Sequence, residues 1–198
     1  MHSSPHPDLV LLPEGVAGLR EPRVSWHWSE LARTAKAQDI TIAVGASVVS
    51  HRDDAGKPVH FINTLELMGS HEGELRAQAS VPIGSWKPWA SSGHYPERWW
   101  SRPDQVMVKN EAIGAILCWE ELMVWPWLSQ WAEGSRVLLV ASNTWFDPSG
   151  RIDFAQRRAT VAMGRLFNFS DHRAVNRPST HLDCGMSIFA EQQCRSTS

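Results

Sequence analysis

Ile113-Gly-Ala-Ile-Leu-Cys-Trp-Glu120 is an apolar run that ends on a thiol followed at once by carboxylates. A short run without polar alternation predicts a strand buried on both faces, here over 112–118. A strand end holds a reactive group rigidly at the edge of a sheet. Cys118 could therefore be a nucleophile, activated by the start of a helix and by a neighbouring base. The alternative is an inert buried cysteine.

A second reactive side chain follows another predicted strand, nearer the N-terminus. Asp8-Leu-Val-Leu-Leu12 is again apolar and short, and Pro13-Glu-Gly15 ends it. Glu14 is thus a carboxylate placed directly after a buried strand, where a rigid base would be expected. An exposed acid in an ordinary turn is the competing interpretation.

The rest of the chain predicts an α/β (α+β) fold. Further buried strands are predicted over 40–49, 59–68 and 137–141, and helices over 24–38, 120–132 and 152–167. The helix over 120–132 should be interrupted near Pro126. Turn residues over 53–58 join two of the strands as a hairpin. These elements predict one domain over 1–178 with a mixed sheet covered by helices on one side, and an irregular tail over 179–198.

Composition excludes several classes of function. The 198 residues are 42% apolar and 20% charged with a net charge of −2, which does not fit nucleic acid as a partner. No apolar run approaches the roughly 18 residues of a membrane span. Cys118, Cys184 and Cys194 form no zinc-type pair and no disulfide framework, which favours a reducing compartment. Eleven tryptophans indicate either core packing or an aromatic-walled pocket for an apolar acyl group.

Four segments in order resemble a known family. They are Asp8-Leu-Val-Leu-Leu-Pro-Glu14, Val81-Pro-Ile-Gly84, Ile113-Gly-Ala-Ile-Leu-Cys-Trp-Glu120 and Ser142-Asn-Thr-Trp-Phe146. Together they resemble the carbon-nitrogen hydrolase (nitrilase) superfamily. Within it they are most similar to the branch of apolipoprotein N-acyltransferase and the conjugal-transfer TraB-like proteins. The resemblance extends over residues 8–176.

The resemblance implies a nitrilase-like α-β-β-α sandwich and a Glu-Lys-Cys catalytic set. Glu14 falls on the general base and Cys118 on the nucleophile of that set. Substrate-binding positions would be Trp119, Glu120, Asn143 and Trp145. The implied substrate is a small-molecule amide, nitrile or acyl compound with a non-peptide C–N bond, attacked to give a cysteine acyl-enzyme. No cofactor is implied, and a role in plasmid conjugal transfer and dimerisation through the sandwich are further expectations.

The sequence departs from the family in three places. The family lysine precedes the Val81-Pro82 pair, but residues 75–80 contain no lysine. We hypothesise that Lys87 or Arg76 replaces this cation; otherwise both are solvated surface charges. The family fold also has elements before Glu14 and after residue 177 that find no counterpart here, so the sandwich is expected to be incomplete at both ends and marginally stable.

Alternatives to a hydrolase or acyltransferase remain. A catalytically inert nitrilase-fold accessory protein of a conjugation or envelope system would explain the missing lysine, and a gene remnant would give no soluble product. The nine histidines form no metal-binding helix motif, so no metal is expected. A papain-like pair of Cys118 with His94 or His60 lacks the usual local signature. The location is cytoplasmic by default, or membrane-associated if the chain belongs to a longer TraB-like protein.

Overall fold

The strands form two sheets that face each other. The computed structural model describes residues 7–20, 26–56, 58–78 and 101–178. One sheet has five strands: β1 (Leu9–Leu11), β2 (Leu19–Arg20), β3 (Thr41–Arg52), β4 (Pro58–Gly69) and β5 (Gly73–Arg76). The other has four: β6 (Val106–Val108), β7 (Glu111–Leu117), β8 (Val137–Asn143) and β9 (Ser170–Asn176).

The first sheet is built around the predicted hairpin. β3 and β4 pair antiparallel with Val44 opposite Glu66, and a bulge follows Val49. β1 and β2 both pair parallel with β3, and β5 pairs antiparallel with β4. Because β1 precedes Glu14, this pairing fixes where the carboxylate leaves the sheet.

The second sheet places the cysteine. Its order is β6-β7-β8-β9, with β7, β8 and β9 parallel to one another. The carboxyl ends of parallel strands lie at the same edge of a sheet. Cys118 at the end of β7 and Asn143 at the end of β8 therefore come out side by side.

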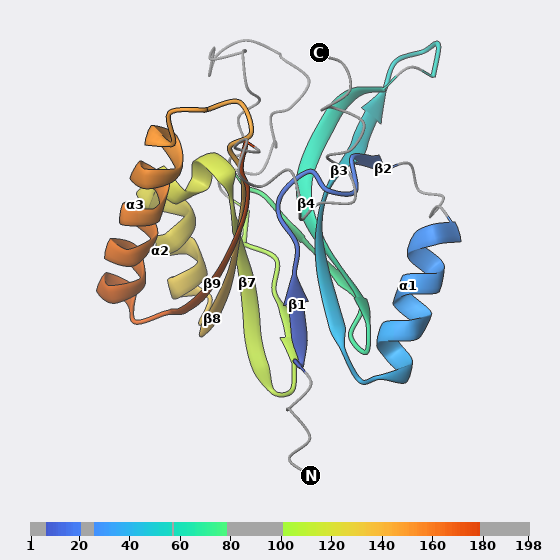
Figure 1. Ribbon diagram of the computed structural model, residues 1–198, viewed down its shortest axis with the longest axis horizontal. Coiled ribbons are helices and arrows are strands. Elements are labelled where there is room, and N and C mark those ends of the chain that lie inside the picture. Colours follow the sequence, from blue (N-terminus) through green and yellow to red (C-terminus); the bar gives the residue numbers. More distant parts are fainter. Residues whose placement is uncertain (1–6, 21–25, 57, 79–100, 179–198) are drawn as a thin grey trace, which may run out of the picture.

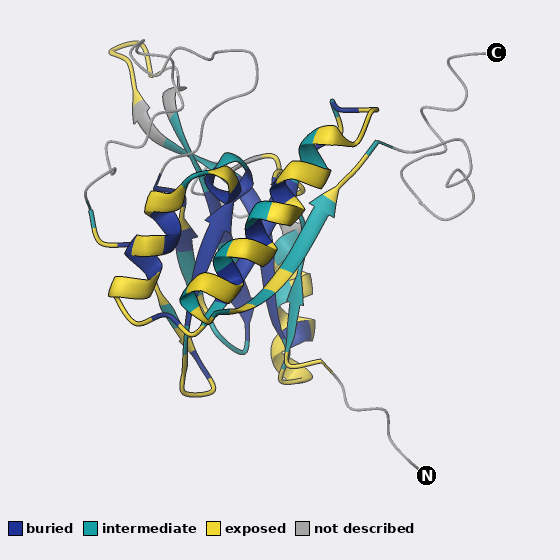
Figure 2. Ribbon diagram, turned by 90° about the vertical axis from the view of Figure 1, so that its left-hand side faces the viewer, coloured by how far each residue is buried: buried dark blue, intermediate teal, exposed yellow. Residues whose placement is uncertain are grey.

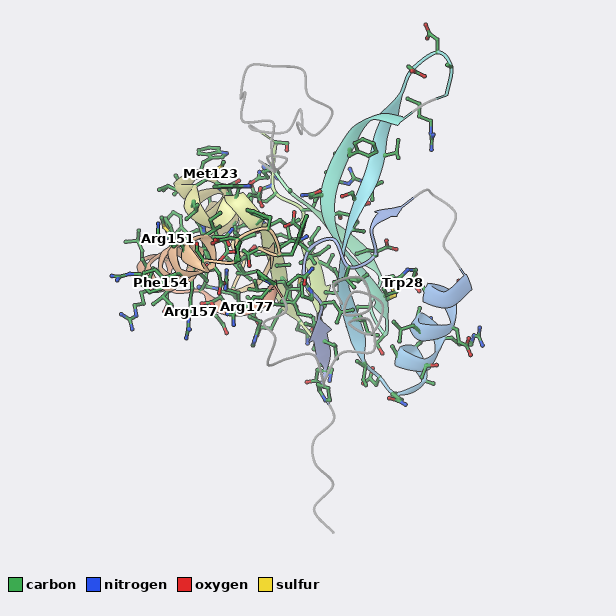
Figure 3. All side chains as sticks on the ribbon, turned by 45° about the horizontal axis from the view of Figure 1, so that its top comes forward. Trp28, Met123, Arg151, Phe154, Arg157 and Arg177 are labelled. Atoms are coloured by element: carbon green, nitrogen blue, oxygen red, sulfur yellow. The ribbon has the colours of Figure 1, made fainter. Side chains whose placement is uncertain are left out.

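Helices cover the outer face of each sheet (Figure 1). Helix α1 (Trp26–Ala37) packs on the first sheet, with Trp28 turned toward it (Figure 3). Helices α2 (Val124–Ala132) and α3 (Arg151–Phe167) cover the second sheet, where Trp127 is fully buried against Ile116, Leu138 and Val140. The layers therefore follow the α-β-β-α order that the resemblance implies.

The main core lies between the two sheets. Its buried members alternate along the strands: Leu65, Leu67, Leu75, Ile113, Ala115, Leu117, Leu139 and Ala141. Figure 2 shows these strands buried between outer helices whose solvent faces are exposed. A strand buried on both faces needs a continuous apolar run, and β7 and β8 have one.

Several predicted elements need correction. Helices cover two facing sheets, so the prediction from periodicity of one mixed sheet covered on one side was wrong. The predicted helix over 120–132 is a 3₁₀ helix, η1 (Cys118–Leu122), followed by α2. The break falls at Met123, since Pro126 lies in the first turn of α2, where a backbone N–H is not needed. The predicted tail over 179–198 lies outside the described residues.

Candidate active site

Glu14 lies in a tight turn after β1. The N–H of Leu12 still pairs with the carbonyl of Ala43, and Pro13 then ends the strand. The turn packs directly on Gly45 of β3, where a side chain would come within 2.4 Å of the Pro13 carbonyl oxygen and 2.5 Å of the Glu14 Cα. Glycine at this position thus lets the turn sit against the sheet and bury Glu14 to 9% exposure.

Cys118 lies where β7 changes into η1, and its backbone is left-handed. Its φ is 52°, a conformation that non-glycine residues rarely adopt. The side chain is 4% exposed and is a free thiol. A single residue with this φ turns the chain sharply, so the thiol leaves the strand direction and meets the turn that carries Glu14.

Glu14 and Cys118 interact directly, and their pKa values reflect it. Burial raises the pKa of Glu14 from its ordinary 4.5 to about 7, while contact with the Cys118 thiol pulls it down. Burial also raises the pKa of the Cys118 thiol well above its ordinary value, and the adjacent Glu14 charge adds to this. Burial and the Glu14 charge therefore favour the neutral thiol at rest, and activation of Cys118 stays a prediction.

The other contacts of Glu14 come from β4 and β8. Asn63 of β4 donates from Nδ2 to Glu14 Oε1 at 2.5 Å. Glu14 Oε2 is buried and makes no hydrogen bond of ordinary geometry to the described residues. The backbone N–H of Asn143 points at both reactive groups and lowers the pKa of each, because it favours their charged forms.

Glu120 is a buried acid that ties η1 to β7 and to the segment that follows β5. Its Oε2 accepts the N–H of Leu117 at 2.8 Å, and its Oε1 accepts the N–H of Gln78 at 2.6 Å. Its own carbonyl accepts the indole N–H of Trp127 at 3.2 Å. These contacts use the carboxylate to shape the turn that follows β7.

The remaining predicted residues differ in position. Trp119 is half-buried in η1 beside the cysteine. The side chain of Trp145 is exposed and packs edge-on to Phe146. The backbone N–H of Trp145 donates to Asn143 Oδ1 at 3.4 Å. The side chain of Arg76 is not brought to the site.

Arg76 belongs to β5, where its neighbours Leu75 and Ala77 point into the core between the sheets. Its side chain is on the opposite face and pairs with Glu74 at 3.2 Å. Lys87 and His94 lie outside the described residues, as do Cys184 and Cys194. His60 lies in β4 opposite His51, toward the hairpin turn from Asn63.

The structure adds three polar groups that the sequence did not single out: Asn63, Glu121 and Arg173. Asn63 orients the Glu14 carboxylate. Glu121 is fully buried next to Cys118 and pairs with Arg173 at 2.7 Å. The sequence held one signal for Glu121, since it is the second acid of a Cys-Trp-Glu-Glu turn, but its partners come from distant elements.

The described residues contain no cluster of His, Cys, Asp and Glu that could hold a metal ion. None of the helices in this part of the chain is long and apolar enough to cross a bilayer. A cavity of about 490 Å³ opens between the sheets and is lined by residues such as Leu9, Ile113 and Val137. These lie at or near the starts of β1, β7 and β8, so the cavity lies at the end opposite the Glu14–Cys118 pair.

Two curated proteins resemble the chain in sequence. It is 25% identical over 165 residues to the conjugal transfer protein TraB of Agrobacterium fabrum, covering 80% of this chain and 37% of that protein. It is 26% identical over 164 residues to a probable conjugal transfer protein TraB of Sinorhizobium fredii, covering 80% and 40%. The chain thus spans well under half the length of these relatives. No protein-family model matches it.

Solved structures resemble the fold at low sequence identity. A carbon-nitrogen hydrolase from Helicobacter pylori matches with a TM-score of 0.61 and 14% identity, over 92% of this chain and 65% of that one. An amidase from Nesterenkonia matches with a TM-score of 0.59 and 14% identity, over 85% and 63%. The chain therefore has the fold of the nitrilase-superfamily carbon-nitrogen hydrolases, and in sequence it is similar to the conjugal transfer proteins named TraB.

Proposed function

We propose that the chain cleaves or forms a non-peptide C–N bond through an acyl intermediate on Cys118, with Glu14 as the general base. The observation that supports this most directly is the contact of a buried carboxylate, with a pKa of about 7, with a buried thiol at the ends of two strands. A base is most effective when its pKa lies near the working pH.

The chemistry follows from the two protonation states. Glu14 as carboxylate takes the thiol proton while the sulfur attacks the carbonyl carbon of an amide, so the C–S bond forms and a tetrahedral oxyanion develops. Glu14 then returns the proton to the nitrogen, the C–N bond breaks and the amine leaves. Water, or an acceptor amine, loses a proton to Glu14 and attacks the thioester. The thiol regains its proton as the C–S bond breaks.

One observation supports an oxyanion site next to this pair. The N–H of Asn143 already faces the sulfur and the carboxylate. Donors aimed at developing charge are worth much in a dry cleft. Arg76 does not supply the cation of the family's catalytic set, because its side chain is paired with Glu74. Lys87 remains our candidate, and Lys87→Ala should lower the acylation rate by about a hundredfold while Arg76→Ala leaves it unchanged.

The substrate class is a small amide, nitrile or activated acyl compound. The amidase from Nesterenkonia forms adducts with acrylamide and with the acetamide moiety of fluoroacetamide at its active-site cysteine, seen in a glutamate-to-glutamine variant. A role in plasmid conjugal transfer is a further proposal, supported by the names of the two sequence relatives.

The test is intact-mass analysis after brief exposure to iodoacetamide or an activated acyl ester at pH 8. Wild type is compared with Glu14→Gln and Cys118→Ala. A base that removes the thiol proton predicts one adduct on Cys118 that forms more slowly in Glu14→Gln, by about tenfold or more. If Glu14 only repels the thiolate, deleting its charge would speed labelling instead, and that outcome would refute the proposal.

An inert accessory protein is the second candidate. The observation in its favour is that the thiol is poorly activated. Burial raises the pKa of Cys118, and no lysine or arginine of the described residues is among the groups that shift it. This candidate predicts that Cys118 labels no faster than a denatured-state thiol and that Glu14→Gln changes nothing.

A further inference from the structure

The second carboxylate after the cysteine joins four elements. Glu121 of η1 is fully buried and accepts hydrogen bonds from Ser142 of β8, from Thr160 Oγ1 of α3 at 2.6 Å, and from Arg173 of β9. Arg173 is bidentate, with Nε at 2.7 Å from one carboxylate oxygen and Nη2 at 3.2 Å from the other. The carboxylate is therefore fully satisfied without touching the site.

The charges of this network are balanced. Arg173 also donates to Asp153 at 2.7 Å, and Asp153 accepts from Arg177 at 2.9 Å. Two arginines thus face two acids, and the inner pair is almost fully shielded from water. A buried ion pair with good geometry and further hydrogen bonds fixes one arrangement of the elements that carry it.

Helix α3 turns a polar face toward the cysteine. Its buried residues are Gln156, Thr160 and Gly164, spaced four apart and therefore on one face. Gln156 Nε2 donates to the carbonyl oxygen of Cys118 at 3.0 Å. The next position on this face, Thr160, binds Glu121. A helix that only filled the core would carry apolar residues here.

This face holds the residue whose backbone is strained. Cys118 has a φ of 52°, and strained residues persist only where the surrounding structure over-determines them. Its carbonyl is held by Gln156, and the turn after it is held through Glu121. On its other side the N–H of Leu117 is held by Glu120.

We propose that Gln156, Thr160, Glu121 and Arg173 form a clamp whose role is to hold the Cys118 turn so that its thiol meets Glu14. They are positioning residues, because each acts through the backbone or side chain of another group. The proposal rests on the proposed function, since the clamp matters to catalysis only if Glu14 serves Cys118. A purely structural role would lower stability without uncoupling the two.

The experiment measures that coupling. The rate of iodoacetamide labelling of Cys118 at pH 8 is compared with and without Glu14→Gln in three backgrounds: wild type, Gln156→Leu and Thr160→Val. We expect Glu14→Gln to slow labelling by about tenfold or more in wild type. In the two clamp variants the same change should alter the rate by less than about threefold, because the thiol no longer faces the base.

Two further backgrounds serve as controls. Met163→Ala loosens the packing of α3 on Trp127 and Leu138 but does not touch the clamp, so the full effect of Glu14→Gln should remain. Thr160→Ser keeps the hydroxyl that binds Glu121 and should restore coupling. Rates are taken below the melting temperature of each variant, with circular dichroism confirming that it is folded.

The outcomes separate the two proposals. If Glu14→Gln has no effect in wild type, the base–nucleophile pair itself is absent and the proposed function fails. If it has its full effect in wild type and also in Gln156→Leu and Thr160→Val, the function stands and the clamp is overturned. If coupling is lost in Met163→Ala as well, the position of the thiol depends on the packing of α3 in general and not on the clamp residues. That outcome would also overturn the proposal.

Discussion

The two reactive residues owe their properties to burial more than to any charged neighbour. Glu14 and Cys118 are both almost inaccessible to water, and both have raised pKa values. Burial thereby favours the neutral thiol at rest, while Glu14, with a pKa of about 7, can take up or release a proton near neutral pH. A site of this kind transfers the thiol proton to Glu14 as the sulfur attacks an electrophilic carbon.

The raised pKa of Glu14 makes a prediction about stability. Its pKa is about 7 when folded, against an ordinary 4.5. Between these values the folded state binds more protons than the unfolded state, so the free energy of unfolding falls as pH rises. The loss through Glu14 amounts to about 3 kcal/mol at most by pH 8.

Glu14→Gln should remove this dependence, since glutamine is always neutral and can still accept from Asn63. Urea unfolding at pH 5 and at pH 8 gives the comparison. We expect the variant to gain stability relative to wild type as pH rises between the two. Parallel curves for the two proteins would show that Glu14 is not held protonated at pH 5 by the fold.

The sequence could single out Glu14 and Cys118 as candidates because each directly follows an apolar run typical of a buried strand and because the segments that carry them resemble the nitrilase superfamily. It could not identify Asn63, Gln156 or Glu121 as their supports. Those contacts join residues that are far apart in the chain, and their polar side chains would look ordinary at any exposed position. The left-handed backbone of Cys118 is likewise set by the surrounding turn. The sequence could not predict it, because this conformation is usually found at glycine.

At the scale of elements, the turn that carries Glu14 depends on the strand beneath it. An added Cβ at Gly45 would lie 2.4 to 2.9 Å from backbone atoms of Pro13, Glu14 and Gly15. Backbone atoms cannot swing aside as a side chain can. Gly45→Ala should therefore lift the turn, cost about 1–3 kcal/mol of stability, and reduce the effect of Glu14 on Cys118 labelling.

Gly73→Ala is a matched control for this prediction. Its Cβ would lie 2.6 Å from a side-chain carbon of Val106, at the edge strands β5 and β6. A smaller loss of stability is expected there, because the Val106 side chain can shift, and the labelling of Cys118 should not change. Equal effects of Gly45→Ala and Gly73→Ala on labelling would contradict the role of the β3 surface in placing Glu14.

The long elements were predictable, whereas of the strands with four residues or fewer only β1 was predicted. The strands β3, β4, β7 and β8 and the helices α1 and α3 agree with the predicted ranges to within a few residues. β2, β5 and β6 have at most four residues, which is too few for an alternation of apolar and polar residues to be recognised. β9 reads Ser-Asp-His-Arg-Ala-Val-Asn and is partly exposed, so its pairing with β8 decides its structure against its polar composition.

At the scale of the whole molecule, the outer face of α2 carries several exposed apolar side chains. Val124, Leu128 and Trp131 of α2 are exposed by 55%, 37% and 54%. Exposed apolar side chains gathered on one helix mark an interaction surface. Beside them α3 presents a basic, exposed face, on which Figure 3 labels Arg151, Phe154 and Arg157.

This arrangement predicts self-association through α2 that strengthens with salt. Trp131 packs against Phe167 at the C-terminal end of α3, so two copies that meet there bring their exposed Arg165 side chains closer, and this repulsion is screened as ionic strength rises. Light scattering after gel filtration, at 50 mM and 500 mM salt, should show more dimer at the higher value. Trp131→Ser should abolish it, whereas Leu31→Ser on α1, exposed by 38%, should not. A monomer under all conditions would mean that this face stays in water, and more dimer at low salt would place oppositely charged groups at the contact.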